Sequence, residues 1–474
     1  MSPDTRISVG MACIVVLAAV GPVRAGDETL SFGKFGTVTL YRQTPQPARV
    51  VLFVSGDGGW NQGVIDMARE LQAKDTLVVG IDIRHYLQAA QSTRESCSYP
   101  AADFEALSQY VQKKLGAPSY RLPVLVGYSS GATLVYATLV QSPPGTFQGA
   151  LGLGFCPDLV VSKPLCKGAG LTWKPGKKGQ GVIFDPAPDL SAPFTTLVGQ
   201  IDQACDAQAT ERFVSEIPRA RVVRLPKVGH GYSVPRNWLP QFLAAYEEIC
   251  AEAPTPAAAS SSPASVPVAD LPLVEVPAQG EGNGRFAVLL TGDGGWAGLD
   301  RELARGLASR GIPTAAWNSL QYYWNPRTPE SAAEDLSRIL QHYAAAWAKQ
   351  RPILIGYSLG ADVMAALVNR LPEQRRQQIE QIVLLGPSDT VSFRFHLSNW
   401  LGGTPKDAVP TLPEILKLDP ARLSCIAGKD DDSICAQLEH RHGRVIWLAG
   451  GHHFSGDYAA VTRAVLDATG EASR

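Results

Sequence analysis

Two serines occupy the pattern G-x-S-x-G, at residues 127–131 and 356–360. A run of Leu, Val and Ile precedes each serine, and residues that favour a helix follow it. A sharp turn between a strand and a helix makes a serine hydroxyl project, and small neighbours let the two elements pass closely. A projecting serine can attack a carbonyl carbon, so Ser129 and Ser358 are candidate nucleophiles.

A serine hydroxyl becomes a strong nucleophile only when a neighbouring base takes its proton. Where the nucleophile follows a central strand of such a fold, the acid and then the histidine come later in the chain. Both halves of the sequence offer this set: Ser129, Asp202 and His230 in the first, and Ser358, Asp431 and His452 in the second. Asp430 and His453 are rivals in the second half, and the match of GHGYS with GHHFS favours His452.

A turn with the sequence GDGGW follows an apolar run in each half, at residues 56–60 and 292–296. In a fold with this kind of serine turn, the loop at this position supplies one backbone N–H to the oxyanion hole. The residue after the nucleophile supplies the other N–H. Adjacent glycines keep side chains away from these donors. The predicted oxyanion hole of the second half therefore consists of Asp293, Gly294, Gly295 and Leu359. We expect Trp296 to pack beside the pocket.

The matching motifs stand in the same order and at nearly constant spacing in the two halves, which indicates a tandem duplication. In the second half, short apolar runs alternate with helical patterns, at residues 286–290, 312–317, 353–355, 382–385, 423–427 and 445–448. This alternation predicts a parallel sheet covered on both faces, with sites at the carboxyl ends of the strands. The predicted fold is α/β, with two tandem α/β-hydrolase-like domains, each a mostly parallel sheet flanked by helices.

The chain has 474 residues, too many for one hydrophobic core. Residues 1–25 read as a cleaved signal peptide, with a short positive start, an apolar stretch and a small-residue cleavage site. The first domain then spans residues 26–250, an Ala/Pro/Ser-rich linker spans 251–278, and the second domain spans 279–474. A net charge of −1 gives no electrostatic reason to expect nucleic acid as a partner.

The eight cysteines, of which seven would remain after export, fit an oxidising compartment. Cys425 and Cys435 bracket a short acidic loop and are one possible pair, and Cys156 with Cys166 is another. The sequence does not pair Cys97, Cys205 and Cys250. No Cys/His spacing resembles a zinc site, so we expect neither a metal nor a cofactor.

The motifs TGDGGW, YYWNPRTPE, GYSLGADV, LLGPS and GGHHF, with the paired-cysteine loop, resemble the VirJ/AcvB family of bacterial virulence proteins. The AcvB type is its long, two-part form. The resemblance implies an α/β-hydrolase-like fold, export to the periplasm, hydrolysis of lysyl- or alanyl-phosphatidylglycerol and a link to virulence and type IV secretion. The expected partners are an aminoacylated phospholipid at the membrane surface and proteins of the envelope or of a secretion system. We expect a monomer.

The ammonium group of such a substrate needs an anion nearby. Asp362 is the first candidate because it follows the nucleophile by one helical turn, although an acid there also complements the helix dipole. Further acidic candidates are Asp389, Asp430 and Glu334. Two aromatic segments, 321–326 with Tyr322 and Tyr323 and 392–403, are predicted lipid contacts or parts of the core. A serine esterase or peptidase with a soluble substrate, and a non-catalytic secretion partner, are the alternative functions.

Overall fold

The computed structural model describes residues 28–92, 97–142, 145–167, 170–176, 180–190, 192–251, 266–280, 282–296, 298–394 and 407–470. The predicted signal peptide, half of the predicted linker and most of the aromatic segment 392–403 lie outside the described residues. No helix in the described ranges combines the length and the apolar character that crossing a bilayer requires.

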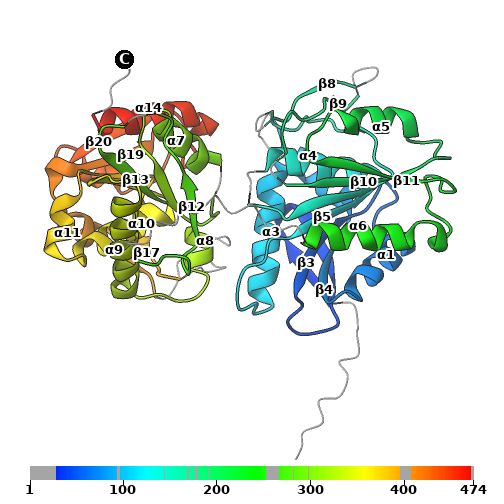
Figure 1. Cartoon of the computed structure of the whole chain (residues 1–474), viewed down its shortest axis with the longest axis horizontal. Coiled ribbons are helices and arrows are strands. Elements are labelled where there is room, and N and C mark those ends of the chain that lie inside the picture. The colour runs from blue at the N-terminus through cyan, green and yellow to red at the C-terminus, as the bar shows by residue number, and fades with distance from the viewer. Residues whose placement is uncertain are drawn as a thin grey trace, which may run out of the picture.

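The first half forms an eight-stranded sheet (Figure 1). In spatial order its strands are β1 (Glu28–Phe32), β2 (Gly36–Tyr41), β4 (Thr76–Ile81), β3 (Arg49–Val54), β5 (Val124–Tyr128), β6 (Gly149–Leu153), β10 (Phe194–Gly199) and β11 (Ala220–Leu225). The pairs β1–β2 and β2–β4 are antiparallel, and all pairs from β4 to β11 are parallel. A small antiparallel sheet of β7 (Asp158–Leu159), β9 (Val182–Phe184) and β8 (Trp173–Pro175) follows β6.

The second half repeats this plan in a seven-stranded sheet. In spatial order its strands are β12 (Leu273–Val276), β14 (Thr314–Trp317), β13 (Arg285–Leu290), β15 (Arg351–Tyr357), β16 (Gln381–Leu385), β19 (Leu423–Gly428) and β20 (Arg444–Leu448). The pair β12–β14 is antiparallel and the others are parallel. A short pair, β17 (Thr390–Val391) and β18 (Val409–Pro410), lies apart. The last part of the predicted linker thus includes β12, an edge strand of the second sheet.

Helices cover both faces of each sheet, as fully buried parallel strands require. The helices of the first domain are α1 (Gln62–Gln72), α2 (Ile83–Gln91), α3 (Pro100–Lys114), α4 (Ser130–Gln141), α5 (Ala207–Ser215) and α6 (Leu239–Ala251), with the 3₁₀ turns η1 (Gly33–Phe35) and η3 (Pro235–Asn237). α1 and α6 pack on one face, and α2, α3 and α4 on the other. α1 turns Val64, Met67, Ala68 and Leu71 to the sheet at helical spacing.

The helices of the second domain are α7 (Gly298–Ala308), α8 (Ser319–Tyr322), α9 (Pro329–Ala346), α10 (Leu359–Asn369), α11 (Glu373–Gln378), α12 (Leu412–Ile415), α13 (Cys435–Leu438) and α14 (Tyr458–Ala468), with η5 (Pro420–Arg422) and η6 (Phe454–Gly456). α7 and α14 cover one face, and α9 and α10 the other. Thr328 caps α9 in a reciprocal hydrogen-bond pair with Ser331, and Pro329 begins the helix. The predicted α/β class and the two tandem domains with mostly parallel sheets are confirmed.

The two domains meet where α3 of the first faces α8 of the second (Figure 1). Trp324, 1% exposed, donates its indole N–H to the carbonyl oxygen of Ala117 at 3.0 Å. Lys113 donates to the carbonyl oxygen of Trp324 at 2.5 Å, and its ammonium lies 4.7 Å from the centre of the indole ring. The aromatic segment 321–326 therefore joins the domains through Trp324, which is buried there, so for Trp324 the structure favours packing over contact with lipid.

Three disulfides join the described cysteines: Cys97–Cys166, Cys156–Cys205 and Cys425–Cys435. The possible pair of Cys425 and Cys435 is present. The possible pair of Cys156 and Cys166 is wrong, because the fold brings the loops after β6 and β10 together and joins Cys156 to Cys205. Cys250 is free. Three disulfides indicate that the chain folds in an oxidising compartment.

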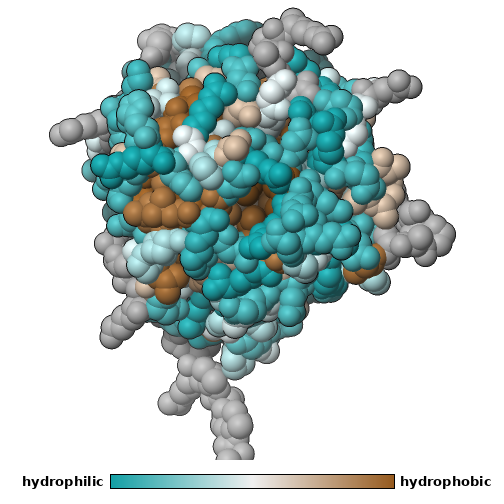
Figure 2. All heavy atoms as spheres, turned by 90° about the vertical axis from the view of Figure 1, so that its left-hand side faces the viewer, coloured by the Kyte–Doolittle hydropathy of each residue, from teal (hydrophilic) through white to brown (hydrophobic). Residues whose placement is uncertain are grey.

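The outer side of the second domain, away from the first, carries apolar surface between hydrophilic side chains (Figure 2). A cavity of about 340 Å³ lies at the ends of α10 and α11, with Val368, Ile379, Ile382 and Leu418 among its lining residues. Ile382 lies near the amino end of β16, whereas Ser358 follows the carboxyl end of β15. The cavity is therefore at the edge of the sheet opposite the candidate nucleophile.

Candidate active site

Ser358 stands on the turn between β15 and α10 in a strained backbone conformation. Its φ is 50° and its ψ is −118°, a region that residues with a Cβ rarely adopt. A Cβ added at Gly356 would lie 2.4 Å from the carbonyl oxygen of Gly360. The two glycines of the motif thus touch each other, which allows the strand and the helix to cross tightly and leaves the hydroxyl of Ser358 at the carboxyl end of the sheet.

His452 and Asp431 complete a hydrogen-bonded chain with this serine. His452 Nε2 lies 3.0 Å from Ser358 Oγ, and its Nδ1 lies 3.1 Å from Asp431 Oδ2. The rival Asp430 is exposed on the same loop. His453 instead bonds Tyr357 Oη through Nδ1 at 2.8 Å, and burial lowers its pKa. The hydrogen bonds therefore join Ser358 to His452 and Asp431, and not to the rival residues His453 and Asp430.

The GDGGW loop lies directly against the nucleophile. A Cβ added at Gly292 would lie 3.5 Å from Cβ of Ser358, and one at Gly360 would lie 2.3 Å from the carbonyl oxygen of Leu290. Gly295, with φ of 76°, closes the turn by donating to the carbonyl oxygen of Gly292 at 3.0 Å. Leu359 is the first residue of α10, so its N–H faces outward at the helix start. The start of the loop, at Gly292, and Leu359 thus lie beside Ser358. That the N–H groups of Asp293–Gly295 and Leu359 form an oxyanion hole stays a prediction.

The first domain holds the same arrangement. Ser129 has φ of 56° and ψ of −125°. Its Oγ lies 2.9 Å from His230 Nε2, and His230 Nδ1 lies 2.9 Å from Asp202 Oδ2. A Cβ added at Gly56 would lie 3.0 Å from Cβ of Ser129, so the first GDGGW loop also flanks its serine. The two halves therefore share the position of all three side chains.

Asp362 lies inside the protein, 8% exposed, one helical turn after Ser358. Its Oδ1 accepts a hydrogen bond from the backbone N–H of Ser388 at 2.6 Å. Burial raises the pKa of the Asp362 carboxyl well above its usual range. Asp362 thus lies inside the protein, where its hydrogen bond to Ser388 fixes the loop after β16. The other acidic candidates, Asp389 and Glu334, are exposed.

The predicted aromatic substrate contacts have different surroundings. Tyr322 and Tyr323 are each 1% exposed in the core of the second domain, and the hydroxyl of Tyr322 donates to Asp335 at 2.6 Å. They cannot touch a substrate in this state, and we leave them out of the proposed site. Trp296 is half-buried under the guanidinium of Arg301, 5.6 Å from its ring, at the end of the GDGGW loop.

Two titratable side chains that sequence reasoning missed, Glu105 and Arg301, interact electrostatically across the two domains, and Glu105 also interacts with Asp293. Glu105 lies on α3 of the first domain. Burial raises its pKa to about 8; the positive charge of Arg301 lowers this pKa, and the negative charge of Asp293 raises it. Burial also lowers the pKa of Arg301, 7% exposed, to about 9. The first domain thus adds a titratable group to the surroundings of the second site. An acid inside an ordinary helical pattern gives no signal for such a contact across domains.

One group of possible metal ligands lies together among the described residues, namely Asp202, Cys205 and His230. Cys205 is in a disulfide, and the other two bond each other. These residues therefore do not fit a metal site.

Comparison with known proteins gives a family and several similar folds. The family model described as bacterial virulence protein (VirJ) matches residues 48–150 and 284–473, more than half of the chain. No curated protein sequence matches this chain.

Solved structures similar to this chain include three hydrolases. The esterase domain of a Rhodothermus marinus protein is 15% identical, with 47% of this chain and 98% of that chain covered and a TM-score of 0.34. Thermogutta terrifontis esterase 2 in its apo form is 14% identical, with 48% and 94% covered and a TM-score of 0.35. A Xanthomonas campestris protein, described as an α/β serine hydrolase without a lid, is 19% identical, with 49% and 97% covered and a TM-score of 0.33.

Proposed function

The chain belongs to the VirJ family of bacterial virulence proteins, and we propose that its second domain is a serine hydrolase that cleaves the aminoacyl ester of lysyl- or alanyl-phosphatidylglycerol. The observation that carries the reaction type is the chain of hydrogen bonds from Ser358 through His452 to Asp431, with the serine in its strained turn. The family resemblance supports the lipid substrate, the periplasmic location and the link to secretion.

In the proposed reaction, Ser358 Oγ attacks the carbonyl carbon of the aminoacyl ester while His452 Nε2 takes the hydroxyl proton. The N–H groups of Leu359 and of the loop Asp293–Gly295 stabilise the oxyanion of the tetrahedral intermediate. His452 then gives its proton to the departing glycerol oxygen, and phosphatidylglycerol leaves. Water, deprotonated by His452, releases the amino acid from Ser358 by the same path in reverse. Asp431 orients the imidazole and stabilises its charged form.

A second candidate is an esterase or peptidase with a soluble substrate. The observation that favours it is the burial of Tyr322, Tyr323 and Trp324, because these aromatic side chains are withdrawn from any lipid surface. In this case the acyl-transfer steps are the same and only the leaving group differs.

The test is the release of free amino acid from vesicles that contain lysyl- or alanyl-phosphatidylglycerol. We expect the purified protein to release it and Ser358→Ala to lose the activity, while His453→Ala stays within a few-fold of wild type. Turnover of short soluble esters at Ser358 without any release from vesicles would favour the soluble substrate. No reaction at Ser358 with either substrate or with a fluorophosphonate would favour a non-catalytic partner of envelope or secretion proteins. Sedimentation of the same sample tests the expected monomer.

A further inference from the structure

We propose that the first domain is a second and independent serine-hydrolase centre, built on Ser129, that cleaves esters with an uncharged acyl group. This centre uses other residues than the reaction proposed for the second domain and does not depend on the lipid substrate. Its hydrogen bonds are as short as those of the second site, with 2.9 Å from Ser129 Oγ to His230 Nε2 and 2.9 Å from His230 Nδ1 to Asp202. The strain is also retained, since Ser129 has a φ of 56°.

The acid of this centre is held more completely than its counterpart in the second domain. The Asp202 side chain is 1% exposed, and its Oδ1 accepts hydrogen bonds from the backbone N–H groups of Ala204 at 2.8 Å and Cys205 at 2.9 Å. The Asp431 side chain is 12% exposed. Burying a carboxylate costs free energy unless hydrogen bonds replace its water. The site therefore has the donors that replace the water of Asp202 and hold its carboxyl group aimed at His230.

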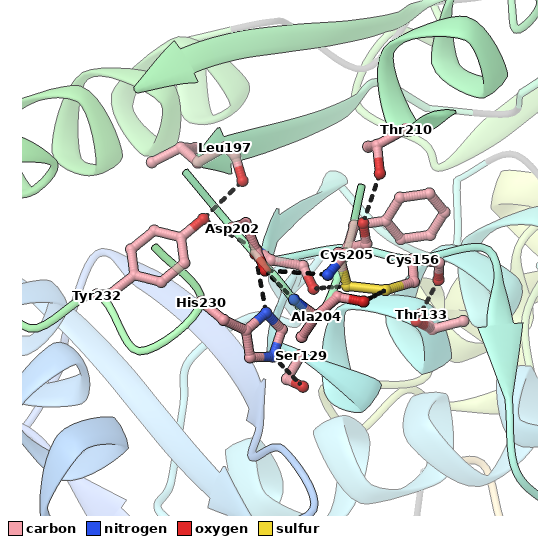
Figure 3. The surroundings of a disulfide bond; sticks show 12 residues. Ser129, Thr133, Cys156, Leu197, Asp202, Ala204, Cys205, Thr210, His230 and Tyr232 are labelled. Carbon is pink, nitrogen blue, oxygen red and sulfur yellow. Dashed lines mark hydrogen bonds and ion pairs between the residues drawn. A yellow bond between two sulfur atoms is a disulfide. The ribbon is translucent and has the colours of Figure 1, made fainter. Parts of the chain in front are cut away.

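A disulfide locks the loops that carry these groups (Figure 3). Cys205, which donates to Asp202, is joined to Cys156 in the loop after β6. The same loop contains Gly154, where a Cβ would lie 3.2 Å from the imidazole of His230. Thr133 Oγ1 donates to the carbonyl oxygen of Cys156 at 2.6 Å and so ties this loop to α4, the nucleophile helix. The disulfide thus connects the loop of Asp202 to the loop that packs under His230, and Thr133 ties that second loop to the nucleophile helix.

The same contact indicates the substrate class. Thr133 occupies the position one turn after Ser129 that Asp362 occupies after Ser358, and its hydroxyl is used in the bond to Cys156. A substrate ammonium close to the nucleophile helix would find no carboxyl group there. An ester with an uncharged acyl group needs none.

The reaction balances without a further reactant. Ser129 Oγ bonds to the acyl carbon and its proton moves to His230 Nε2. The bond between the acyl carbon and the alcohol oxygen then breaks, and that oxygen leaves as an alcohol with the proton from His230. Water adds to the acyl-serine, gives its proton to His230, and the carboxylic acid departs as Ser129 regains its hydrogen.

The test uses the full chain with a fluorophosphonate probe and mass spectrometry of the labelled peptides. We expect two adducts per wild-type chain, one adduct on Ser129 in Ser358→Ala, and none in the double variant Ser129→Ala/Ser358→Ala. Ser358→Ala should also hydrolyse p-nitrophenyl butyrate at least 10-fold faster than the double variant. If Ser129 in folded Ser358→Ala takes no label and this ester is not turned over above the double variant, the first domain is not a hydrolase.

The role of the disulfide is tested in the Ser358→Ala background with p-nitrophenyl butyrate. We expect Cys156→Ser/Cys205→Ser to lower kcat at least 10-fold with KM within about twofold, because Asp202 loses its aim while the acyl pocket stays. Removal of the distant disulfide by Cys97→Ser/Cys166→Ser should lower only the unfolding temperature. Thr133→Val, which removes one hydrogen bond, should lower kcat several-fold even if the cysteine variant fails to fold. An unchanged kcat in Thr133→Val and in any folded Cys156→Ser/Cys205→Ser sample would overturn the positioning role.

Discussion

The contact between the two motif glycines allows a sharp test of how the nucleophile is positioned. In Gly356→Ala the new methyl group would lie 2.4 Å from the carbonyl oxygen of Gly360 and 2.6 Å from the backbone nitrogen of Ala361. An ordinary contact needs about 1 Å more, and both obstacles are backbone atoms of the helix that begins beside Ser358. Such overpacking costs about 1–3 kcal/mol of stability, and a shift of about 1 Å in a reacting atom lowers a rate about 100-fold.

Urea unfolding measures the stability of Gly356→Ala, and the rate of fluorophosphonate attachment to the Ser358 peptide measures the reactivity of the serine. Gly63→Ala is the matched control, because its methyl group would lie 3.4 Å from the Asn61 side chain in the first turn of α1. Alanine there should be neutral or stabilise the helix by up to about 1 kcal/mol. Wild-type stability together with a wild-type labelling rate in Gly356→Ala would refute the steric reasoning.

Three further predictions concern the acid, the domain contact and a disulfide. Asp431→Asn should lower turnover at Ser358 about 10³–10⁴-fold while the exposed Asp430→Asn stays near wild type, and the reverse pattern would reassign the acid. Because burial raises the pKa of Glu105 to about 8, its stabilising contribution is complete below about pH 4.5 and is lost as the pH rises through 8. The free energy of unfolding should therefore fall by about 4 kcal/mol from about pH 5 to about pH 8.5, and Glu105→Gln should abolish this fall, whereas equal slopes would contradict the assignment. Replacing Cys425 and Cys435, 10 residues apart, by serine should cost about 3 kcal/mol in urea unfolding, and a loss below about 1 kcal/mol would show that the loop is ordered without the bond.

The sequence was sufficient for the fold and for the Ser, His and Asp side chains that lie together in each domain, because both depend on local signals that occur twice. An apolar run, a glycine, a serine and a second glycine specify a strand, a strained turn and a helix within a few residues. The order of the later motifs then assigns each to the end of a parallel strand, where the chains of a sheet bring them together. This reasoning selected Ser358 and His452 without any coordinates, and the second copy made coincidence implausible.

The features that the sequence did not predict depend on contacts between distant segments. The cysteine pairs follow from which loops meet beyond β6 and β10, and spacing along the chain contains no record of that meeting. The aromatic segment with Trp324 gave the same pattern for a lipid contact and for a domain interface. Asp362 looked like an exposed acid at a helix start, and only its burial and its hydrogen bond from the N–H of Ser388 show that it fixes a loop.

The two domains differ in how they fix one loop beside the nucleophile, the loop after β6 in the first domain and after β16 in the second. This difference has a chemical consequence. In the first domain Thr133 and a disulfide hold the loop, so the position one helical turn after Ser129 carries a hydroxyl group and not a carboxyl group. In the second domain Asp362 holds the loop through its bond to Ser388, and a carboxyl group with a raised pKa lies one helical turn from the nucleophile. A positive charge brought beside Asp362 would favour its ionised form, because an opposite charge nearby lowers the pKa of a carboxyl group. The second site can therefore respond to a cationic acyl group in a way that the first cannot, although both position Ser, His and Asp alike.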